Sequence, residues 1–376
     1  MAESEQDASE PAQDEIPQGK AGADSPKLEL RPSRLFSAWL ANAGVSIGFT
    51  TYQAGKIFLI GSNPETGRIS VYERTFSRCM GLGVGQDGRS LWLASLYQLW
   101  RFENFLDPGQ TRDGYDAVLV PVEGRTTGDV DIHDVHPLGP AAPPIFVVTR
   151  FNCLATLDHV NSFLPVWKPP FIDRIAAEDR CHLNGLAMRD GKPAYVTCVA
   201  NANVAGAWRE HRRDGGMVLD VASGEPVATG LSMPHSPRLY DGELYISQSG
   251  TGEFGRIDIS TGAFEPMCFL PGFARGVAFA GRHALIGLSR PRREQAFEGL
   301  ALNERLEKER VSPTCGIAVV NLDTGDVEHT LELGSAVQEL YDVATLPGVK
   351  RPMILGFRTP EIRFAIRPGR MAGAAS

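Results

Sequence analysis

Short runs of alternating or continuous hydrophobic residues cover most of the chain, and turn-forming Gly, Asp and Asn residues separate them. Runs of this kind are typical of β-strands, whereas amphipathic helices show a period of about 3.6 residues. Only two segments look helical, one near residues 175–180 and one in the charged insert at 293–310. The pattern predicts an all-β protein with a short helical insert.

A five-residue turn motif occurs four times. An Asn or Asp follows an apolar run and a Gly comes four positions later, at 63–67, 220–224, 258–262 and 321–325. An Asx side chain begins such a turn, and Gly supplies the positive φ at its end. The four copies indicate a repeated unit of strands joined by tight turns.

A longer strand–turn–strand repeat accompanies these turns. Its six copies begin at Met80, His133, Asn184, Ser236, Arg275 and Tyr341. Successive copies lie 39 to 66 residues apart, which is close to the length of a β-propeller blade, about 40–50 residues. We expect a single β-propeller over residues 31–370. The residues on either side of the repeats favour seven blades over six, and the two ends should pair in one blade to close the ring.

Composition and charge narrow the range of functions. The formal net charge is -8 and no basic block is present, which argues against a nucleic-acid partner or an anionic membrane surface. No apolar run approaches the roughly 20 residues of a membrane helix. The six cysteines lack C-x-x-C spacing, so we expect neither a zinc knuckle nor a disulfide framework.

Residues 1–30 are rich in Glu, Asp, Gln, Ser, Ala and Pro, and we expect them to form a disordered acidic tail. The tail lacks the apolar core of a secretory signal peptide. We therefore expect a cytoplasmic protein with reduced, buried thiols. The tail either keeps the protein soluble or contacts a protein partner.

Gly250, Gly252 and Gly255 spell G-x-G-x-x-G. In a dinucleotide-binding turn this motif follows a strand and opens a helix. Here another strand-like run follows, so we interpret the glycines as part of a hairpin. The G-x-S-x-G, P-loop and H-E-x-x-H motifs are absent, which removes the commonest hydrolase, NTPase and metalloprotease signatures.

The most informative positions lie at the start of each repeat, because in a propeller they ring one mouth of the central channel. They are Arg78, Met80, His133, Asp134, His182, Asn184, His235, Ser236, Arg275, Glu339 and Tyr341. Three of the eight histidines fall at equivalent places in three consecutive repeats, and His136 replaces His133 if the register is shifted. Neutral imidazoles beside carboxylates or amides suit a divalent transition metal such as Zn, Cu, Fe or Mn, or acid–base catalysis.

These positions give three groups of candidate residues. The candidate metal ligands are His133, His182 and His235. The candidate catalytic residues are Arg275, Glu339, Tyr341 and Asp134, with Arg275 holding an anionic group. The candidate ligand-binding residues are Asn184, Ser236, Trp208 and Arg78. Two long loops, at 199–216 and 290–314, should overhang the same mouth, and Trp208 belongs to the first of them.

Two functions fit these residues. The first is a metal-dependent enzyme whose site lies at the channel mouth and which acts on a small polar or anionic substrate by hydrolase, lyase or oxidoreductase chemistry. The alternative is a non-catalytic propeller that binds a small molecule or a protein partner on the same face. Metal chemistry requires imidazole nitrogens within about 2.0–2.2 Å of one point, whereas a binding wall tolerates dispersal.

Four blocks of the sequence, at 78–104, 178–197, 230–258 and 269–292, resemble a family of conserved hypothetical bacterial proteins of the TIGR03032 type. The resemblance runs from about residue 35 to residue 366. It implies a β-propeller and carries over no activity, ligand or catalytic residue. The functional hypotheses therefore rest on the residues alone.

Overall fold

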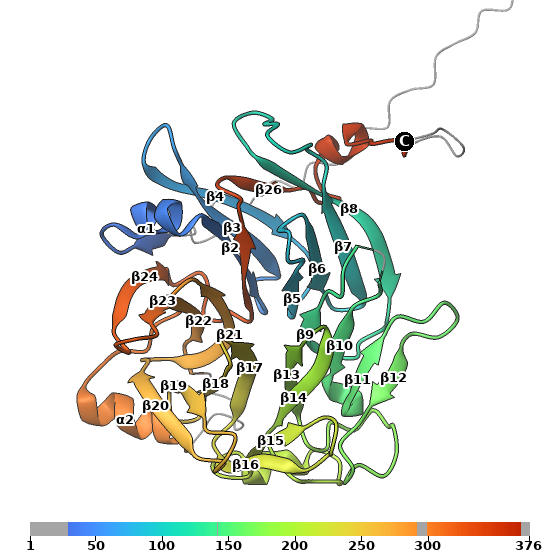
Figure 1. Cartoon of the computed structure of the whole chain (residues 1–376), viewed down its shortest axis with the longest axis vertical. Helices are drawn as coiled ribbons and strands as arrows, with labels where there is room; N and C mark the ends of the chain where they lie inside the picture. The colour runs from blue at the N-terminus through green and yellow to red at the C-terminus, as the bar shows by residue number, and fades with distance from the viewer. Residues whose placement is uncertain (1–28, 141, 292–298, 370–376) are drawn as a thin grey trace, which may run out of the picture.

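The computed structural model describes residues 29–140, 142–291 and 299–369. Six β-sheets are arranged around a central axis (Figure 1). The predicted all-β propeller is confirmed, and its ring has six blades rather than the favoured seven. Most of the predicted tail, residues 1–28, lies outside the described residues.

The first blade joins two segments that are far apart in the sequence. Its innermost strand, β25 (Val343–Pro347), pairs with β2 (Val45–Thr51). Strands β3 (Lys56–Asn63) and β4 (Arg68–Thr75) complete the sheet outward. The ring is therefore closed as expected, by pairing of early and late strands in one blade.

The residues that suggested a seventh blade extend other blades instead. Strand β1 (Leu30–Pro32) adds to the outer edge of the sixth blade, where it pairs with β24. Strand β26 (Pro352–Ile354) runs parallel to β8 at the outer edge of the second blade. Helix α1 (Phe36–Ala43), which the sequence pattern did not reveal, occupies more of the early residues. Both added strands cover edges that would otherwise expose unpaired backbone groups.

The other five blades each contain four consecutive antiparallel strands, numbered from the axis outward. The second blade contains β5 (Leu82–Val84), β6 (Ser90–Ala94), β7 (Gln98–Asn104) and β8 (Ala117–Thr126). The third contains β9 (Ile132–His136), β10 (Ile145–Val148), β11 (Cys153–Thr156) and β12 (Leu164–Trp167). The fourth contains β13 (Leu183–Arg189), β14 (Lys192–Cys198), β15 (Gly216–Asp220) and β16 (Pro226–Leu231).

The fifth and sixth blades follow the same order. The fifth contains β17 (Pro234–Tyr240), β18 (Glu243–Gln248), β19 (Glu253–Ile257) and β20 (Phe264–Phe269). The sixth contains β21 (Phe273–Ala280), β22 (His283–Ser289), β23 (Gly316–Asn321) and β24 (Val327–Leu333). The hydrophobic core lies between neighbouring blades, as where Phe254 of the fifth blade and Ile286 of the sixth belong to one buried cluster.

The four Asx turns connect third and fourth strands. In each, the backbone N–H of the glycine donates to the carbonyl of the Asn or Asp four residues earlier, at 2.7 to 2.9 Å. All four glycines have positive φ, between 65° and 78°. Gly252 of the G-x-G-x-x-G stretch lies in the turn between β18 and β19, so that stretch belongs to a hairpin as predicted.

Each of the two long loops carries a helical segment. Helix α2 (Ala301–Glu309) lies between β22 and β23, although residues 292–298 of the insert are outside the described residues. A short 3-10 helix (Ala207–His211) lies between β14 and β15. The prediction of helix near 175–180 is wrong, because those residues form bends and irregular backbone. No helix in the described part of the chain is long and apolar enough to cross a bilayer.

Candidate functional site

The innermost strands all begin on one face of the ring, which we call the mouth. Two sets of equivalent residues, one from each blade, lie there. The outer tier consists of Arg78, Asp131, His182, Met233, Phe273 and Glu339. The middle tier, two positions later, consists of Met80, His133, Asn184, His235, Arg275 and Tyr341. His182 therefore lies one tier further out than the other two histidines. The prediction that the three histidines occupy equivalent positions is wrong.

An inner tier, one residue after the middle tier, joins neighbouring blades. In alternate blades it has a polar side chain that accepts a backbone N–H of the next blade: Leu186 N donates to Asp134, Gly276 N to Ser236 and Leu82 N to Asp342, at 3.1, 2.9 and 2.8 Å. The other blades have Gly81, Gly185 or Gly276, where a Cβ atom would come within 3.0 Å of the next blade's backbone. The six blades thus repeat as three pairs.

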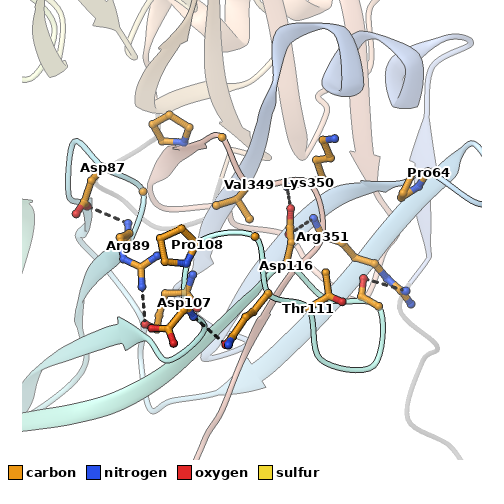
Figure 2. A pocket seen from close by; sticks show the side chains of 17 residues that line it. Pro64, Asp87, Arg89, Asp107, Pro108, Thr111, Asp116, Val349, Lys350 and Arg351 are labelled. Atoms are coloured by element: carbon orange, nitrogen blue, oxygen red, sulfur yellow. Dashed lines mark hydrogen bonds between the residues drawn. The ribbon is translucent and has the colours of Figure 1, made fainter. Parts of the chain in front are cut away.

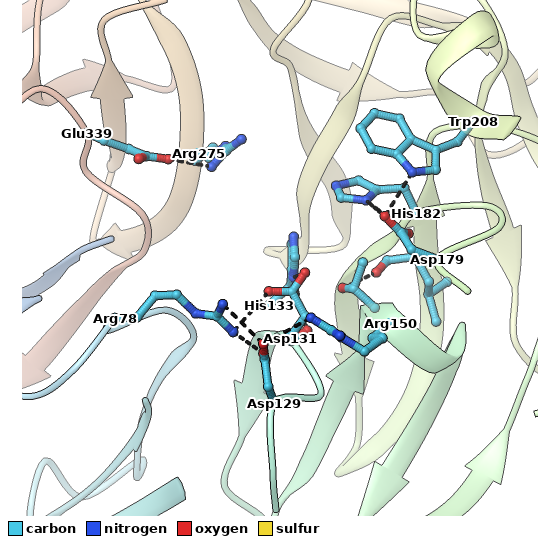
Figure 3. Close-up of polar contacts among 12 residues, drawn as sticks. Arg78, Asp129, Asp131, His133, Arg150, Asp179, His182, Trp208, Arg275 and Glu339 are labelled. Atoms are coloured by element: carbon cyan, nitrogen blue, oxygen red, sulfur yellow. Dashed lines mark hydrogen bonds and ion pairs between the residues drawn. The ribbon is translucent and has the colours of Figure 1, made fainter. Parts of the chain in front are cut away.

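His182 is held by a carboxylate and an indole ring. Both carboxylate oxygens of Asp179 lie close to Nδ1 of His182, at 3.1 and 3.2 Å, and Nε1 of Trp208 donates to Asp179 at 2.8 Å (Figure 3). The Trp208 ring stacks on the imidazole with 4.2 Å between centroids. Since Nδ1 donates to the carboxylate, Nε2 is left as the acceptor of the neutral ring.

Local electrostatics and backbone geometry reinforce this contact. Burial alone would raise the pKa of Asp179, but the imidazole of His182 and the indole N–H of Trp208 hold it below its usual value. Asp179 is therefore ionised near neutral pH. Asp179 and His182 both have positive φ, 41° and 51°, and three equivalent outer-tier residues, Arg78, Asp131 and Met233, share this conformation with His182.

His133 and His235 are buried, neutral imidazoles. Nδ1 of His133 donates to the Asp131 carbonyl at 3.1 Å, and Nδ1 of His235 donates to the Met233 carbonyl at 2.8 Å. Burial lowers the pKa of His133 to about 4 and that of His235 well below its usual range. Nε2 of His235 is buried without a hydrogen-bond partner among the described residues. Together with His182, these rings give the mouth three Nε2 acceptors.

Arg275 lies across the mouth from His182 (Figure 3). Its guanidinium pairs with the carboxylate of Glu339 at 3.1 Å. It also lies over the rings of Phe273 and Tyr341, 4.7 and 5.2 Å from their centroids. Stacking and ion pairing together fix the position of this cation.

Two other middle-tier residues have polar atoms without partners. The hydroxyl of Tyr341 and Nδ2 of Asn184 are buried and have no hydrogen-bond partner in the described part of the chain. The Asn184 carbonyl oxygen accepts from the Thr197 hydroxyl at 2.7 Å, which fixes the direction of the amide. Burial raises the pKa of Tyr341 well above its usual value, so its hydroxyl keeps its proton. Both groups are therefore potential hydrogen-bond donors.

Arg78 belongs to an ion-pair network at the rim. It pairs with Asp129 and lies 3.8 Å from a carboxylate oxygen of Asp131, while Arg150 donates to Asp129 at 3.0 Å. The guanidinium of Arg78 is therefore already paired with carboxylates of the protein. Its predicted contact with a ligand stays a prediction.

Asp134 and Ser236, also predicted as site residues, make structural contacts. Besides accepting from Leu186, Asp134 forms a two-contact ion pair with Arg238, at 2.7 and 3.1 Å. Burial would raise the pKa of Asp134, but Arg238 and His136 together lower it instead. His136 thus lies beside Asp134, at 3.1 Å, rather than in the place of His133. The inner tier holds the ring together, and roles for Asp134 and Ser236 in chemistry stay predictions.

The sequence reasoning missed the carboxylates that orient the mouth. Asp179 precedes His182 by three positions, and Asp129 and Asp131 precede His133. Acidic residues two to four positions before these two histidines were the available signal. The metal centre is not found: among the described residues, no group of three or more His, Cys, Asp and Glu side chains is arranged to hold a metal ion.

A separate pocket of about 550 Å³ lies on the opposite face, between the first and second blades (Figure 2). Its charged groups are largely used by the chain itself. The carboxylate of Asp116 accepts the backbone N–H groups of Lys350 and Arg351, both at 2.8 Å. Arg89 donates to two backbone carbonyls at the end of β7. The mouth, where polar atoms lack partners, is the stronger candidate site.

A protein-family model described as a domain of unknown function, DUF4915, matches residues 34–355. The chain belongs to this family. The DUF4915 match spans strands of all six blades and therefore includes every mouth residue. The finer resemblance to the TIGR03032 type stays a prediction. No curated protein matches the chain.

Three solved structures resemble this DUF4915 member at low sequence identity, and of these three only the nidogen/laminin chain has a TM-score above 0.5. A chain of a nidogen/laminin complex is 8% identical, with a TM-score of 0.53 over 81% of this chain and 99% of that one. A protein of unknown function from Bacteroides caccae is 12% identical, with a TM-score of 0.45 over 80% and 98%. Virginiamycin B lyase from Staphylococcus aureus is 12% identical, with a TM-score of 0.37 over 82% and 99%. At this level, likeness bears on fold alone.

Proposed function

We propose that this protein is an enzyme, that the mouth is its active site, and that His182 transfers protons to and from a small polar or anionic substrate. The observation that carries the proposal is the contact of His182 with Asp179 and Trp208. A carboxylate that holds one imidazole nitrogen, while the other points toward the centre of the site, is the arrangement of a general acid–base (Figure 3).

The chemistry follows from the tautomer. Nε2 of His182 takes a proton from the substrate, or from a water molecule that attacks it, and the ionised Asp179 stabilises the resulting imidazolium. The imidazolium then returns the proton to the leaving group. Hydrolysis and elimination both need this pair of transfers, and such a residue contributes about 10²–10⁴-fold in rate.

Arg275 and Tyr341 have complementary roles in this proposal. The guanidinium of Arg275 holds an anionic group of the substrate or an oxyanion that forms during the reaction. The Tyr341 hydroxyl, whose pKa is raised by burial, donates a hydrogen bond to the same oxygen. Glu339 positions Arg275 without contacting the substrate.

A metal-dependent version of the proposal uses His133, His182 and His235. Each of these imidazoles donates from Nδ1 to an oxygen and keeps Nε2 for a ligand, as metal-bound histidines do. Against this version, the described residues contain no group of three or more suitable side chains arranged around one point. Acid–base chemistry through His182 is therefore the better supported version, and elemental analysis tests the other.

The test is an untargeted turnover assay. The full chain is incubated with a small-molecule extract, and mass spectrometry records which compounds are consumed or formed. The His182→Asn variant should lose about 10²–10⁴-fold of any turnover, because Asn has no acid–base function but tolerates positive φ. The Asp179→Asn variant should show a smaller loss.

The matched control is His159→Asn, which changes an exposed histidine in the loop between β11 and β12, on the opposite face. Turnover in the control should equal that of the unchanged protein. Equal turnover in His182→Asn would show that the proposal is wrong. Compounds that bind but are never converted would support the non-catalytic alternative, and stoichiometric metal lost only in His182→Asn would support the metal-dependent version.

A further inference from the structure

The two sides of the mouth differ in hydrogen-bonding character. The third, fourth and fifth blades, which are consecutive, contribute the imidazoles of His133, His182 and His235. The sixth and first blades, which are also neighbours, contribute Arg275 and Tyr341. We infer that the substrate is a small hydroxycarboxylic acid, with its hydroxyl groups on the imidazole side and its carboxylate on the arginine side. This inference rests on the proposed function, because it places the substrate in the same site.

The imidazole side requires hydrogen-bond donors. Each ring uses its Nδ1–H on an oxygen of the protein, so each Nε2 carries a lone pair. Nε2 of His235 is buried without a partner among the described residues, and an unpaired buried acceptor destabilises the folded protein. A carboxylate cannot satisfy a lone pair, whereas a hydroxyl group can.

A hydroxyl group suits this side better than an ammonium group. The positive charge of Arg275 lies near His235, because the guanidinium and the imidazole both contact the Phe273 ring, at 4.7 and 5.6 Å from its centroid. The same charge repels a second cation placed at Nε2 of His235. A neutral donor avoids this repulsion, so we assign the imidazole side to hydroxyls.

The opposite side suits a carboxylate. Arg275 is held by Glu339 and by the rings beneath it, so its guanidinium needs little ordering on binding. The ring of Tyr341 lies beside the guanidinium, and its hydroxyl lacks a partner in the described part of the chain. A phenol that keeps its proton donates to a carboxylate oxygen, and a charged acceptor makes such a bond stronger.

The burial of these groups limits the size of the substrate. Arg275, His235 and Tyr341 are 8%, 4% and 6% exposed. The buried amide N–H group of Asn184, in the blade that also contributes His182, is a further donor for a hydroxyl or carboxylate oxygen. A compact molecule that carries both kinds of group satisfies these atoms, whereas a polymer reaches only the rim.

The test is isothermal titration calorimetry of the full chain with two matched sets of compounds. One set is glycerate, glycerol and propionate, and the other is gluconate, glucitol and hexanoate. In each set the second compound lacks the carboxylate and the third lacks the hydroxyls. At least one hydroxy acid should bind at least about tenfold more tightly than its two partners, since each loses its contacts on one side.

Variants assign the contacts. Tyr341→Phe removes one hydroxyl and should weaken binding of the hydroxy acid by about tenfold or more without changing the affinity for the polyol. The control is Tyr195→Phe, which removes a hydroxyl that contacts Arg189 away from the mouth. Binding in the control should be unchanged.

Several outcomes would overturn the inference. It fails if neither hydroxy acid binds below about 10 mM, if a polyol or simple acid binds as tightly, or if serine binds more tightly than glycerate. If the turnover assay identifies substrates that have no carboxylate, this inference is wrong, while the proposal that the protein is an enzyme still holds. If the protein binds a hydroxy acid tightly but converts no compound, the proposal that it is an enzyme is wrong, while the inferred class of ligand is supported.

Discussion

The inner and middle tiers of the propeller lie one residue apart on the same strands, yet their polar side chains have opposite environments. In the inner tier, Asp134, Ser236 and Asp342 each accept a backbone N–H group of the next blade. In the middle tier, the adjacent residues His235 and Tyr341 have buried polar atoms without partners among the described residues. In each of these two pairs, one side chain joins the blades, and its neighbour has a buried polar atom without a hydrogen-bond partner among the described residues.

This difference indicates where the protein gives up stability for function. Buried polar groups are almost always hydrogen-bonded in folded proteins, and those that are not call for an explanation. The inner tier follows this rule and the middle tier departs from it. A local departure inside an otherwise consistent structure is typical of a binding or catalytic site. The comparison predicts large stability effects in the inner tier and small ones in the middle tier.

The largest effect should follow Asp134→Ala. This change leaves the buried guanidinium of Arg238 without its carboxylate partner and the N–H of Leu186 without its acceptor. Breaking a buried ion pair by removing one partner costs about 3–5 kcal/mol. Urea denaturation followed by tryptophan fluorescence should show this loss. The control is Asp326→Ala, which changes an exposed residue; its free energy of unfolding should stay within about 0.5 kcal/mol of that of the unchanged protein. An equal loss in both variants would show that the inner tier has no special role in stability.

A smaller loss should follow Gly185→Ala. A Cβ atom at this position would lie 2.4 Å from Cδ of Pro237 and 3.0 Å from the backbone nitrogen of Ser236. The fourth and fifth blades would have to separate, at a cost of about 1–3 kcal/mol. Gly356→Ala is the control, because its nearest atom would be 3.4 Å away, on the side chain of Arg74. Equal denaturation midpoints would mean that the blades can shift without cost.

The sequence predicted those features that repeat. The Asx turns and the strand–turn–strand units gave the propeller, because each copy reinforces the same pattern. The blade count was harder to predict, since β1 and β26 are single edge strands outside any repeat. Helix α1 was missed for the same reason.

The candidate site could be predicted in outline but not in detail. Repeat starts identified the ring that contains His133, His235 and Arg275. The repeat starts placed His182 two positions before Asn184, but the sequence did not show that such an offset moves a side chain to another tier of the mouth. The role of Asp179 required the backbone geometry that brings its carboxylate to Nδ1 of His182. Sequence spacing does not specify a contact of that kind.

Asp342→Asn should change the pH dependence of stability. Burial and the neighbouring Asp134 raise the pKa of Asp342 to about 7, against the opposing effect of Arg238. A carboxyl group that holds its proton more tightly in the folded state stabilises the protein at low pH, and this contribution is lost as the pH rises from about 4 to 7. An asparagine does not ionise, although it keeps one oxygen for the two backbone N–H groups, of Leu82 and Val343, that the carboxylate accepts. The variant should therefore lack this pH-dependent part of the stability, whatever its stability at a single pH.

Thermal unfolding measured at intervals between pH 5 and 8 provides the test. The stability of the unchanged protein relative to the variant should fall across this range. A constant difference would show that Asp342 does not titrate there. Asp326→Asn, an exposed carboxylate, is the control and should give a constant difference.

The smallest effect should come from Tyr341→Phe, in the middle tier. The hydroxyl has no hydrogen-bond partner in the described part of the chain, while the ring stacks on Tyr52 with 6.0 Å between centroids and meets His133 edge-on at 5.4 Å. Phenylalanine keeps the ring and removes only the unpaired group, so the free energy of unfolding should stay within about 0.5 kcal/mol or increase slightly. A loss above about 1 kcal/mol in urea denaturation would mean that the protein itself uses this hydroxyl. Unchanged stability combined with weaker ligand binding would instead show that the middle tier is reserved for the ligand.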